Sequence, residues 1–383
     1  MDVLICDSTA FRYWRIPPIA QLLAAAPEAD IRLTKVLSGN DLELLSARAL
    51  RACEKFAKPH CGNAGELYRT MLDAVPLLSL CGDGPFDLLS KDNRDVRRSS
   101  LVEPKVWSAG APVGGTREAT ELFGVTSPEF TLQQLAARAS LERTLLLASE
   151  LCGGFSVFRP PAEIAGVIQR LCNRGVLPKI GGWEPCLSGS GKLTDLWKRP
   201  PLTTPSDLKH LAETSESSRG RARLSLVADL VTPDAASPFE VQAGILLGLS
   251  ARRGGAGLDG FKFNHKVWLT PDAALLSKRG SCSCDLYWDE GLDVECHSIT
   301  WHAERDSQLS DFARETALEL MGIEVLPITY EQLSSPRQFD AIVRIITSKL
   351  GRKQPAKTKT SQAAANRLWK EVLKVDWLRL PDV

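Results

Sequence analysis

The stretch CDLYWDEGLDVECHSITWH, residues 284–302, concentrates side chains that bind metals or move protons. It contains Asp285, Glu295, His297 and His302, and so two carboxylates and two of the five histidines in the chain. Carboxylate oxygens are preferred ligands of hard divalent cations such as Mg²⁺, and a neutral imidazole accepts a proton near pH 7. These residue types predict a metal-dependent catalytic centre or the remains of one.

The positions of the two carboxylates follow from a predicted β-hairpin. Two strand-like segments, 283–288 and 292–297, are joined by three residues that end in Gly291, which matches a type I turn closed by a bulge. That loop length places Asp285 opposite Glu295, where two like charges repel each other. A divalent cation between them would remove this cost, whereas a two-residue loop would send them to opposite faces of the sheet.

The neighbouring segments predict a mixed domain around this hairpin. Ser237 and Glu240 form the S-x-x-E pattern of a helix-capping box, with a proline between them at the first helical position. The other predicted elements are a strand at 263–270, a helix at 308–321, a strand at 323–330 and a helix at 336–350. The order is therefore α-β-β-β-α-β-α, with the paired carboxylates on the central hairpin.

This arrangement resembles the PD-(D/E)xK nuclease superfamily, and within it the branch of the very short patch repair (Vsr-like) endonucleases. The residues that carry the resemblance are Asp285 on the second strand, the Glu295-Cys-His-Ser motif on the third, Asp311-Phe-Ala-Arg314, and the strand GIEVLPITYEQL. The SPFE sequence that includes Glu240 is similar to the opening helix of these domains, whose glutamate can join the metal site. The sequence departs from the family where His297 stands in place of the usual Asp, and the superfamily's Lys is absent.

The resemblance implies a restriction-endonuclease-like α-β-β-β-α-β core and cleavage of DNA phosphodiester bonds by a metal-activated water. Asp285 and Glu295 would hold Mg²⁺ or Mn²⁺, with His297 or His302 as the base. The same resemblance makes Glu240 a catalytic candidate and Arg314 a phosphate contact. The departures from the family pattern favour the alternative of a catalytically degenerate, DNA-binding regulator that keeps the nuclease fold. A protein-interaction module is a third interpretation, and it predicts no nucleic-acid binding.

Each candidate residue also has a plain structural interpretation. The two carboxylates can be polar residues near a turn, the histidines can be hydrogen-bonded structural residues, and helix capping alone explains Glu240. Arg314 can form a surface salt bridge. Zinc is a further alternative, because the chain has suitable ligand types at Cys282, Cys284, Cys296, His297 and His302. Strand alternation places Cys284 and Cys296 on the face opposite His297, which favours buried thiols instead.

An upstream segment carries a second resemblance. SPEFTLQQLAARASLERTLLLASELCGGF, residues 127–155, is similar to AbiEi-like type IV antitoxins. It predicts one helix from the N-cap Ser127 to about residue 139 and another over 141–151, ended by two glycines. The resemblance implies a DNA-binding protein with a partner protein in a defence or toxin–antitoxin locus. Together, the two resemblances cover roughly residues 66–350.

The sequence predicts an α/β, mixed α+β chain with several regions. Short strands are expected at 76–80, 86–90, 104–108 and 121–125. The predicted regions are a short helical segment at 1–65, a mixed α+β AbiEi-like domain at 66–185, a connector at 186–222, the nuclease-like domain at 223–350, and a basic linker with a C-terminal helix at 351–383.

Composition restricts the function classes. The formal net charge of +1 gives no global attraction to nucleic acid. Residues 349–383 are locally basic, with nine Lys or Arg against three Asp or Glu, which fits a phosphate-contacting arm or a solvated tail with a docking helix at 362–375. Ten cysteines without a CxxC pair predict reduced thiols. No apolar run is long enough for a signal peptide or a membrane span, so a cytoplasmic protein is expected.

Overall fold

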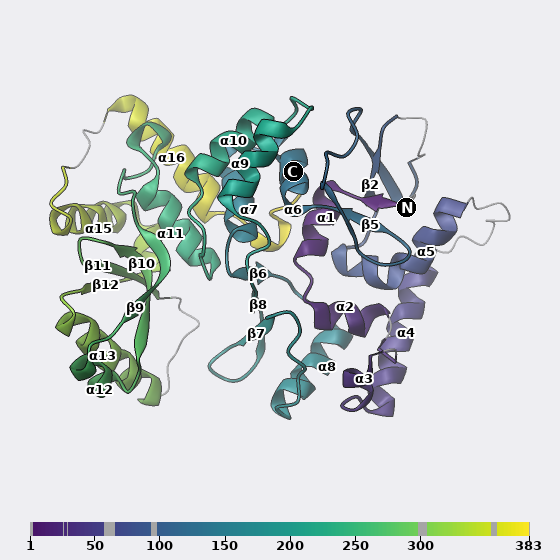
Figure 1. Ribbon diagram of the computed structural model, residues 1–383, viewed down its shortest axis with the longest axis horizontal. Helices are drawn as coiled ribbons and strands as arrows, with labels where there is room; N and C mark the ends of the chain where they lie inside the picture. The colour runs from purple at the N-terminus through teal and green to yellow at the C-terminus, as the bar shows by residue number, and fades with distance from the viewer. Residues whose placement is uncertain are drawn as a thin grey trace.

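The computed structural model describes residues 3–25, 27–28, 30–56, 66–92, 98–297, 305–353 and 358–382, with the backbone alone at 66 and 305–311. Three separate β-sheets are combined with helices along the whole described chain, which confirms the mixed α+β class. In Figure 1 the N-terminal sheet and its helices lie on the right and the green C-terminal sheet on the left. Helices of the middle of the chain lie between these two sheets (Figure 1).

The N-terminal sheet joins segments that are far apart in sequence. Its strand order is β3-β2-β1-β5-β4. The central strand β1 pairs antiparallel with β2 and parallel with β5, so the sheet crosses the boundary predicted at residue 65. The strands are β1 Leu4–Ile5, β2 Phe86–Ser90, β3 Val102–Val106, β4 Thr116–Glu118 and β5 Gly124–Thr126. The helices of this part are α1 Asp7–Trp14, α2 Pro18–Ala25, α3 Ile31–Thr34, α4 Gly39–Phe56 and α5 Glu66–Leu78, followed by the 3₁₀ turn η1 Ser79–Cys81.

The strand predicted at 76–80 is wrong. These residues form the end of α5 and the turn η1. Met71, Val75 and Leu78 are buried on one side of α5, at the three- and four-residue spacing of a helix. The apolar run thus belongs to a helix face, although a short apolar run alone fits a strand equally well.

The middle of the chain forms two helix pairs and a small antiparallel sheet. Ser127 and Ser140 cap α6 and α7 with their side chains, as predicted for the first of them. The helices are α6 Pro128–Ala136, α7 Leu141–Leu151, α8 Ala162–Asn173, α9 Pro205–Thr214 and α10 Arg221–Leu230. The strands β6 Phe155–Val157, β7 Glu184–Leu187 and β8 Leu193–Lys198 lie in the order β6-β8-β7. The predicted connector at 186–222 therefore contains a strand and a packed helix.

The C-terminal part has the predicted order of its main elements, with two short helices and a 3₁₀ turn added. Its sheet runs β12-β11-β10-β9, in which β9, β10 and β11 are antiparallel and β12 is parallel to β11. The strands are β9 Lys262–Trp268, β10 Ser281–Trp288, β11 Leu292–His297 and β12 Glu324–Thr329. The helices are α11 Pro238–Gly248, α12 Pro271–Ser277, α13 Arg305–Leu320, α14 Tyr330–Ser334 and α15 Pro336–Lys349, with the 3₁₀ turn η2 Ala251–Arg253. The short helices α12, between β9 and β10, and α14, between β12 and α15, have no counterpart in the prediction, and neither has η2.

The C-terminal helix docks onto the rest of the molecule. α16, Lys359–Leu373, packs against α11 and α7 through Leu368 and Val372. The chain then passes through the turn η3, Trp377–Arg379, and returns to the N-terminal part, where Ser8 donates to the Pro381 carbonyl at 2.6 Å. Of the two expectations for this tail, the structure contains the docking helix.

The apolar core is shared between regions. One core extends from Leu145 of α7 through Leu246 of α11 to Val294 of β11 and Leu368 of α16. A second core surrounds the N-terminal sheet and includes Trp197 of β8. The middle and C-terminal parts thus bury a common interior, which holds the C-terminal sheet firmly at its α11 face.

Candidate active site

The hairpin of β10 and β11 has the register that its turn predicts. Trp288 pairs with Leu292 and Leu286 pairs with Val294, across a three-residue turn. Gly291 has a φ of +85°, and its N–H donates to the Trp288 carbonyl at 3.0 Å. Because a left-handed residue is required at this position, glycine there fixes the register and hence the positions of the acidic residues.

The ladder is interrupted at Asp285. In the described strands, Asp285 has no backbone partner in β9 or in β11, although its neighbours Cys284 and Leu286 pair normally. Instead its carboxylate Oδ2 accepts the Cys296 N–H at 2.8 Å. The predicted direct pair of Asp285 and Glu295 is therefore replaced by a bond from the Asp285 side chain to the backbone of β11.

This interruption changes which side chains share a face. Leu286 and Trp288 lie in the large core beside α11. Cys282 and Cys284, at positions of the same parity, instead pack with Leu318 of α13 on the other side of the sheet. Strict alternation would place all four residues on one face, and the strand departs from it at the unpaired residue. The predicted common face of Cys284 and Cys296 is therefore wrong, because Cys296 packs against the large core.

Glu295 is held by an arginine. Arg314 Nη2 on α13 donates to Glu295 Oε1 and to the Ser283 carbonyl, and it lies 3.6 Å from Asp293 Oδ2. The side chains of Arg314 and Glu295 are 15% and 11% exposed. Burial alone would lower the pKa of Arg314, but the hydrogen bond and charge of Glu295 outweigh it and raise this pKa. The proposed phosphate contact therefore lies inside the domain, among carboxylates.

Asp293 is a site residue that the sequence analysis missed. It is fully buried, and neither of its carboxyl oxygens accepts a hydrogen bond from a described residue. Burial first, and then the neighbouring Glu295, raise the pKa of Asp293 to about 10. At neutral pH it is thus a neutral acid that can donate a proton to a hydrogen bond with Glu295. Its position two residues before Glu295 was the available signal, since such residues share a strand face.

Asp285 and Glu240 complete the acidic cluster. Burial, followed by the charges of Glu295 and Glu240, raises the pKa of Asp285 to about 8, while the Cys296 N–H and Arg314 act in the opposite direction. Burial is also the main cause that raises the pKa of Glu240, and Glu295 adds to it. The four carboxyl groups of this cluster, Glu240, Asp285, Asp293 and Glu295, thus influence one another around a single guanidinium.

Glu240 is held in place by three donors. Its Oε2 accepts the Ala236 N–H and the Asn264 side-chain amide, each at 2.7 Å, and its Oε1 accepts the Ser237 hydroxyl at 2.8 Å. Ser237 caps α11 by accepting the Glu240 N–H, as predicted. The reciprocal half of the predicted capping box is different, because the glutamate reaches the N–H of Ala236 rather than that of Ser237.

Asn264 is a second residue that the sequence analysis did not single out. It lies in the middle of β9, beside the gap at Asp285, with a φ of +49°. Its side-chain amide donates to Glu240 and, at 2.9 Å, to the carbonyl of Asp234, which also has a positive φ of +69°. Two left-handed residues other than glycine are uncommon and cluster where a structure positions functional groups. No local sequence signal indicates such a backbone inside a strand.

The predicted histidines do not join the cluster in the described structure. His297 is the last residue of β11 and is exposed, and its side chain has no hydrogen bond or ion pair with a described residue. His302 lies outside the described residues. His297 is thus placed at the surface near the acidic cluster, with its imidazole open to solvent.

The arrangement does not form a finished metal cage. Within the described parts of the chain, no group of three or more His, Cys, Asp or Glu residues is placed so that it could hold a metal ion. The structure also separates the thiols of the zinc alternative, because Cys282 and Cys284 pack with Leu318 of α13 whereas Cys296 packs against the larger core. What remains is a buried excess of carboxyl groups beside one arginine.

Comparisons with known proteins give no family for this chain. No family model, no curated protein and no solved structure matches it. A search of the described helices found none that is long and apolar enough to cross a membrane.

Proposed function

We propose that the C-terminal domain is a metal-dependent endonuclease-like domain that cleaves DNA phosphodiester bonds. The observation that carries the proposal is the gathering of Glu240, Asp285 and Glu295, from one helix and two adjacent strands, with more carboxyl groups than the single guanidinium of Arg314 can neutralise. Pronounced pKa shifts caused by burial together with specific charge partners are typical of functional sites. The resemblance of these motifs to Vsr-like endonucleases supports the same function.

Two carboxylates have the capacity to hold a cation. Asp285 Oδ1 accepts no hydrogen bond from a described residue, and Arg314 engages only Oε1 of Glu295. Mg²⁺ or Mn²⁺ at these oxygens would offset the like-charge repulsion within the cluster, and would supply a water of lowered pKa and a counter-charge for phosphate. Because the two carboxylates are not arranged to coordinate one ion together, the Glu295 side chain must turn partly away from Arg314 before both can bind the same cation.

The other residues have supporting roles in this proposal. Glu240, whose carboxyl oxygens accept hydrogen bonds from three donors, is fixed in place and shapes that end of the cluster. His297 is exposed two residues beyond Glu295, where its imidazole is free to take a proton from a water at the cluster. The missing Lys of the superfamily leaves this histidine as the base within the described part of the third strand.

A catalytically degenerate DNA-binding regulator is the second candidate. The ion pair between Arg314 and Glu295 favours it, because a guanidinium already occupies part of the volume and neutralises part of the charge that a cation would serve. Such a regulator would bind DNA without divalent ions and would work with a partner protein of a defence or toxin–antitoxin locus, as the upstream resemblance implies. A cytoplasmic location fits both candidates and remains a prediction.

Calorimetric titration with Mg²⁺ and Mn²⁺ tests the proposal. The wild type is compared with the double variant Asp285→Ala/Glu295→Ala. A matched control, Asp289→Ala/Glu290→Ala, removes two exposed carboxylates from the turn of the same hairpin, where they pair with Lys262 and Arg352. We expect binding in the wild type and the control and none in the Asp285/Glu295 variant. Each protein is first shown to be folded by circular dichroism and thermal melting.

The outcomes separate the two candidates. Binding that depends on Asp285 and Glu295, followed by Mg²⁺-dependent nicking of plasmid DNA, would support the endonuclease. Folded wild-type protein that binds neither ion would overturn it. Salt-dependent DNA binding without divalent ions would then favour the regulator, because phosphate contacts release counterions and weaken as salt rises.

A further inference from the structure

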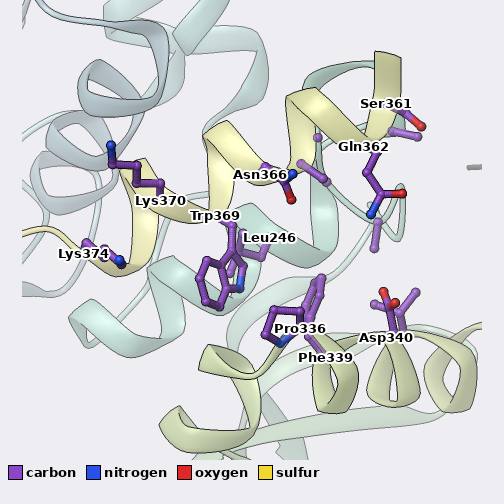
Figure 2. A pocket seen from close by; sticks show the side chains of 16 residues that line it. Leu246, Pro336, Phe339, Asp340, Ser361, Gln362, Asn366, Trp369, Lys370 and Lys374 are labelled. Carbon is purple, nitrogen blue, oxygen red and sulfur yellow. The ribbon is translucent and has the colours of Figure 1, made fainter. Parts of the chain in front are cut away.

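A pocket with a volume of about 410 Å³ lies away from the acidic cluster, between α11, the turn η2, α15 and α16. Its lining includes none of the four carboxyl residues of the cluster. Figure 2 shows Gln362, Asn366 and Trp369 projecting from α16 toward Pro336, Phe339 and Asp340 on α15. The pocket is large enough for a small organic ligand, since such sites typically measure about 300–1,000 Å³.

Two glycines let the helices close around this pocket. A Cβ at Gly254, which has a φ of +96°, would lie 2.5 Å from the Ala364 carbonyl oxygen on α16. A Cβ at Gly255 would lie 2.0 Å from the Leu249 carbonyl oxygen. Side chains are therefore excluded at both positions, and α16 rests directly on the backbone of the η2 turn.

The walls suit a planar aromatic ring. Trp369 forms one wall, and its indole N–H donates to the Leu333 carbonyl at 3.3 Å, which fixes the orientation of the ring. Phe339 and Pro336 lie opposite, and Leu246 of α11 forms the back (Figure 2). Aromatic side chains bind the flat faces of heterocyclic bases by stacking.

Polar groups at one end can read the edge of such a ring. Gln362 and Asn366 are one helical turn apart, and neither side-chain amide makes a hydrogen bond with another described residue. Each amide offers a donor and an acceptor, the combination that pairs with the amino group and ring nitrogen of adenine. Both point from α16 into the space above Asp340 (Figure 2).

Two lysines lie at the rim at the other end of the pocket. Lys370 and Lys374, again one turn apart, line it beyond Trp369, and neither forms an ion pair with a described residue. The Lys370 side chain points away from Phe339 in Figure 2, so it must turn toward the pocket to contact a ligand there. A nucleoside monophosphate has the matching sequence of groups, namely a base with a polar edge, a flat ring face and an anionic phosphate.

We propose that this pocket binds a purine nucleoside monophosphate, with adenine as the preferred base. The base lies between Trp369 and Phe339, and its edge meets the amides of Gln362 and Asn366. The phosphate lies at the rim beyond Trp369, where the long side chains of Lys370 and Lys374 turn inward to meet it. This site is independent of the proposed nuclease function and would exist in either of the two candidate proteins.

Calorimetric titration of the full chain with adenosine monophosphate tests the proposal, beside cytidine monophosphate, adenosine and inorganic phosphate. Ala365→Phe fills the pocket from α16, and Gln362→Ala/Asn366→Ala removes the edge contacts without touching a buried residue. Lys370→Ala/Lys374→Ala removes the anion contacts. Arg367→Ala is the matched control, since it removes a cation from the same helix outside the pocket lining.

Adenosine monophosphate is expected to bind more tightly than the other three probes. The filled variant should lose at least about tenfold in affinity, the size expected when a ring cannot enter its stacking site. The lysine variant should bind adenosine monophosphate roughly threefold to tenfold more weakly than the wild type does, and its affinity for adenosine should be unchanged. The amide variant should abolish the preference for adenine, and Arg367→Ala should change nothing.

Three results would overturn the proposal. The first is no binding of adenosine monophosphate at millimolar concentration by folded wild-type protein. The second is a folded Ala365→Phe variant that binds adenosine monophosphate with the affinity of the wild type. If that variant does not fold, an amide variant that prefers adenine as strongly as the wild type does would overturn the proposal instead. The third is inorganic phosphate binding as tightly as the nucleotide, which would reduce the site to a pair of surface lysines.

Discussion

Two buried charged networks in this molecule differ in how well their charges are balanced. In the first, Arg15 Nε donates to Glu150 Oε1 at 2.8 Å, and a second nitrogen reaches Glu150 Oε2. The remaining contacts come from the backbone: the Val157 N–H donates to Glu150 at 3.0 Å, and Arg15 donates to the Trp377 carbonyl at 2.8 Å. Arg15 and Glu150 thus pair one guanidinium with one carboxylate, and a second buried guanidinium, that of Arg199, donates to the backbone carbonyl of Glu150 at 2.6 Å.

The second network, around Arg314, has four carboxyl groups for one guanidinium. Asp293 has no donor among the described residues, and the pKa values of Asp285 and Asp293 are raised to about 8 and about 10. A network that only stabilises a fold needs no such excess of like charge, because each added buried carboxyl group costs free energy. Arg15 and Glu150 therefore join segments of the fold, whereas the acidic cluster holds more carboxyl groups than Arg314 can neutralise.

Breaking the balanced network should have the largest effect. Glu150→Ala leaves Arg15 buried without its carboxylate, and losing one partner of a buried ion pair typically costs about 3–5 kcal/mol of unfolding free energy. Asp195→Ala is the matched control, because it removes one partner of the exposed pair with Arg159 and should cost less than about 1 kcal/mol. Urea unfolding followed by circular dichroism measures both. Similar losses in the two variants would contradict the assignment of Arg15 and Glu150 as a main structural connection.

Replacing one ionisable carboxyl group of the unbalanced network by a neutral amide should stabilise the protein. A raised pKa means that the folded protein holds the proton more tightly than the unfolded chain. The contribution of these two groups to stability is therefore greatest at about pH 4 and below, and it falls as the pH rises toward about 8 for Asp285 and about 10 for Asp293. Asp293→Asn keeps the shape of the neutral acid, so it should gain up to about 4 kcal/mol between pH 5 and pH 8, at about 1.4 kcal/mol per pH unit.

The measurement for Asp293→Asn is the free energy of unfolding against pH, in buffer with a chelator to exclude bound cations. The control Asp289→Asn changes an exposed carboxylate in the turn of the same hairpin and should follow the wild-type curve. Parallel curves for wild type and Asp293→Asn would mean that Asp293 is not the protonated group. A gain in stability confined to acidic pH would contradict the expectation that the gain grows as the pH rises, and so would contradict a raised pKa of Asp293.

The left-handed asparagine beside the cluster should have an intermediate effect. Asn264→Gly accepts the positive φ but loses the donors to Glu240 and Asp234, at a net cost of about 1 kcal/mol. Asn264→Ala loses the same bonds and also strains the backbone, so its cost should reach about 2 kcal/mol. Thermal unfolding of both variants measures the difference. Equal costs would show that the backbone at this position relaxes when the side chain is removed.

The sequence predicted the parts of this cluster that depend on local chemistry. The three residues of the hairpin turn determined the register of β10 and β11, and Ser237 marked the start of α11. Glu240, Asp285 and Glu295 were predicted as site residues and do influence one another in the structure. Their catalytic and metal-binding roles stay predictions, because no measurement or comparison tests them.

What the sequence could not predict depends on distant or irregular contacts. The spacing of Asp293 and Glu295 indicates a shared strand face, but the complete burial of Asp293 beside Arg314 of α13 depends on packing that the strand sequence does not contain. The backbone of Asp285 is unpaired beside the left-handed Asn264 on the next strand, and no residue close to Asp285 in sequence predicts this interruption. Likewise, β1 pairs with strands more than eighty residues away, so the residues around it look like an isolated helical segment.

An effect no larger than that at Asn264 is expected in the turn that sets the register of the cluster. Gly291→Ala strains a left-handed residue and places a Cβ 3.0 Å from the Gly322 carbonyl oxygen, so it should cost roughly 1–2 kcal/mol. Gly322→Ala is the matched control, with a φ of +76° and no atom within 4 Å of its Cβ, and it should cost only the backbone strain. Thermal unfolding measures both variants. A shift in the pH dependence of unfolding of Gly291→Ala would mean that the turn controls the positions of the carboxyl groups. An unchanged pH dependence would mean that β12 and the Arg314 ion pair hold β11 in register even when the turn is strained.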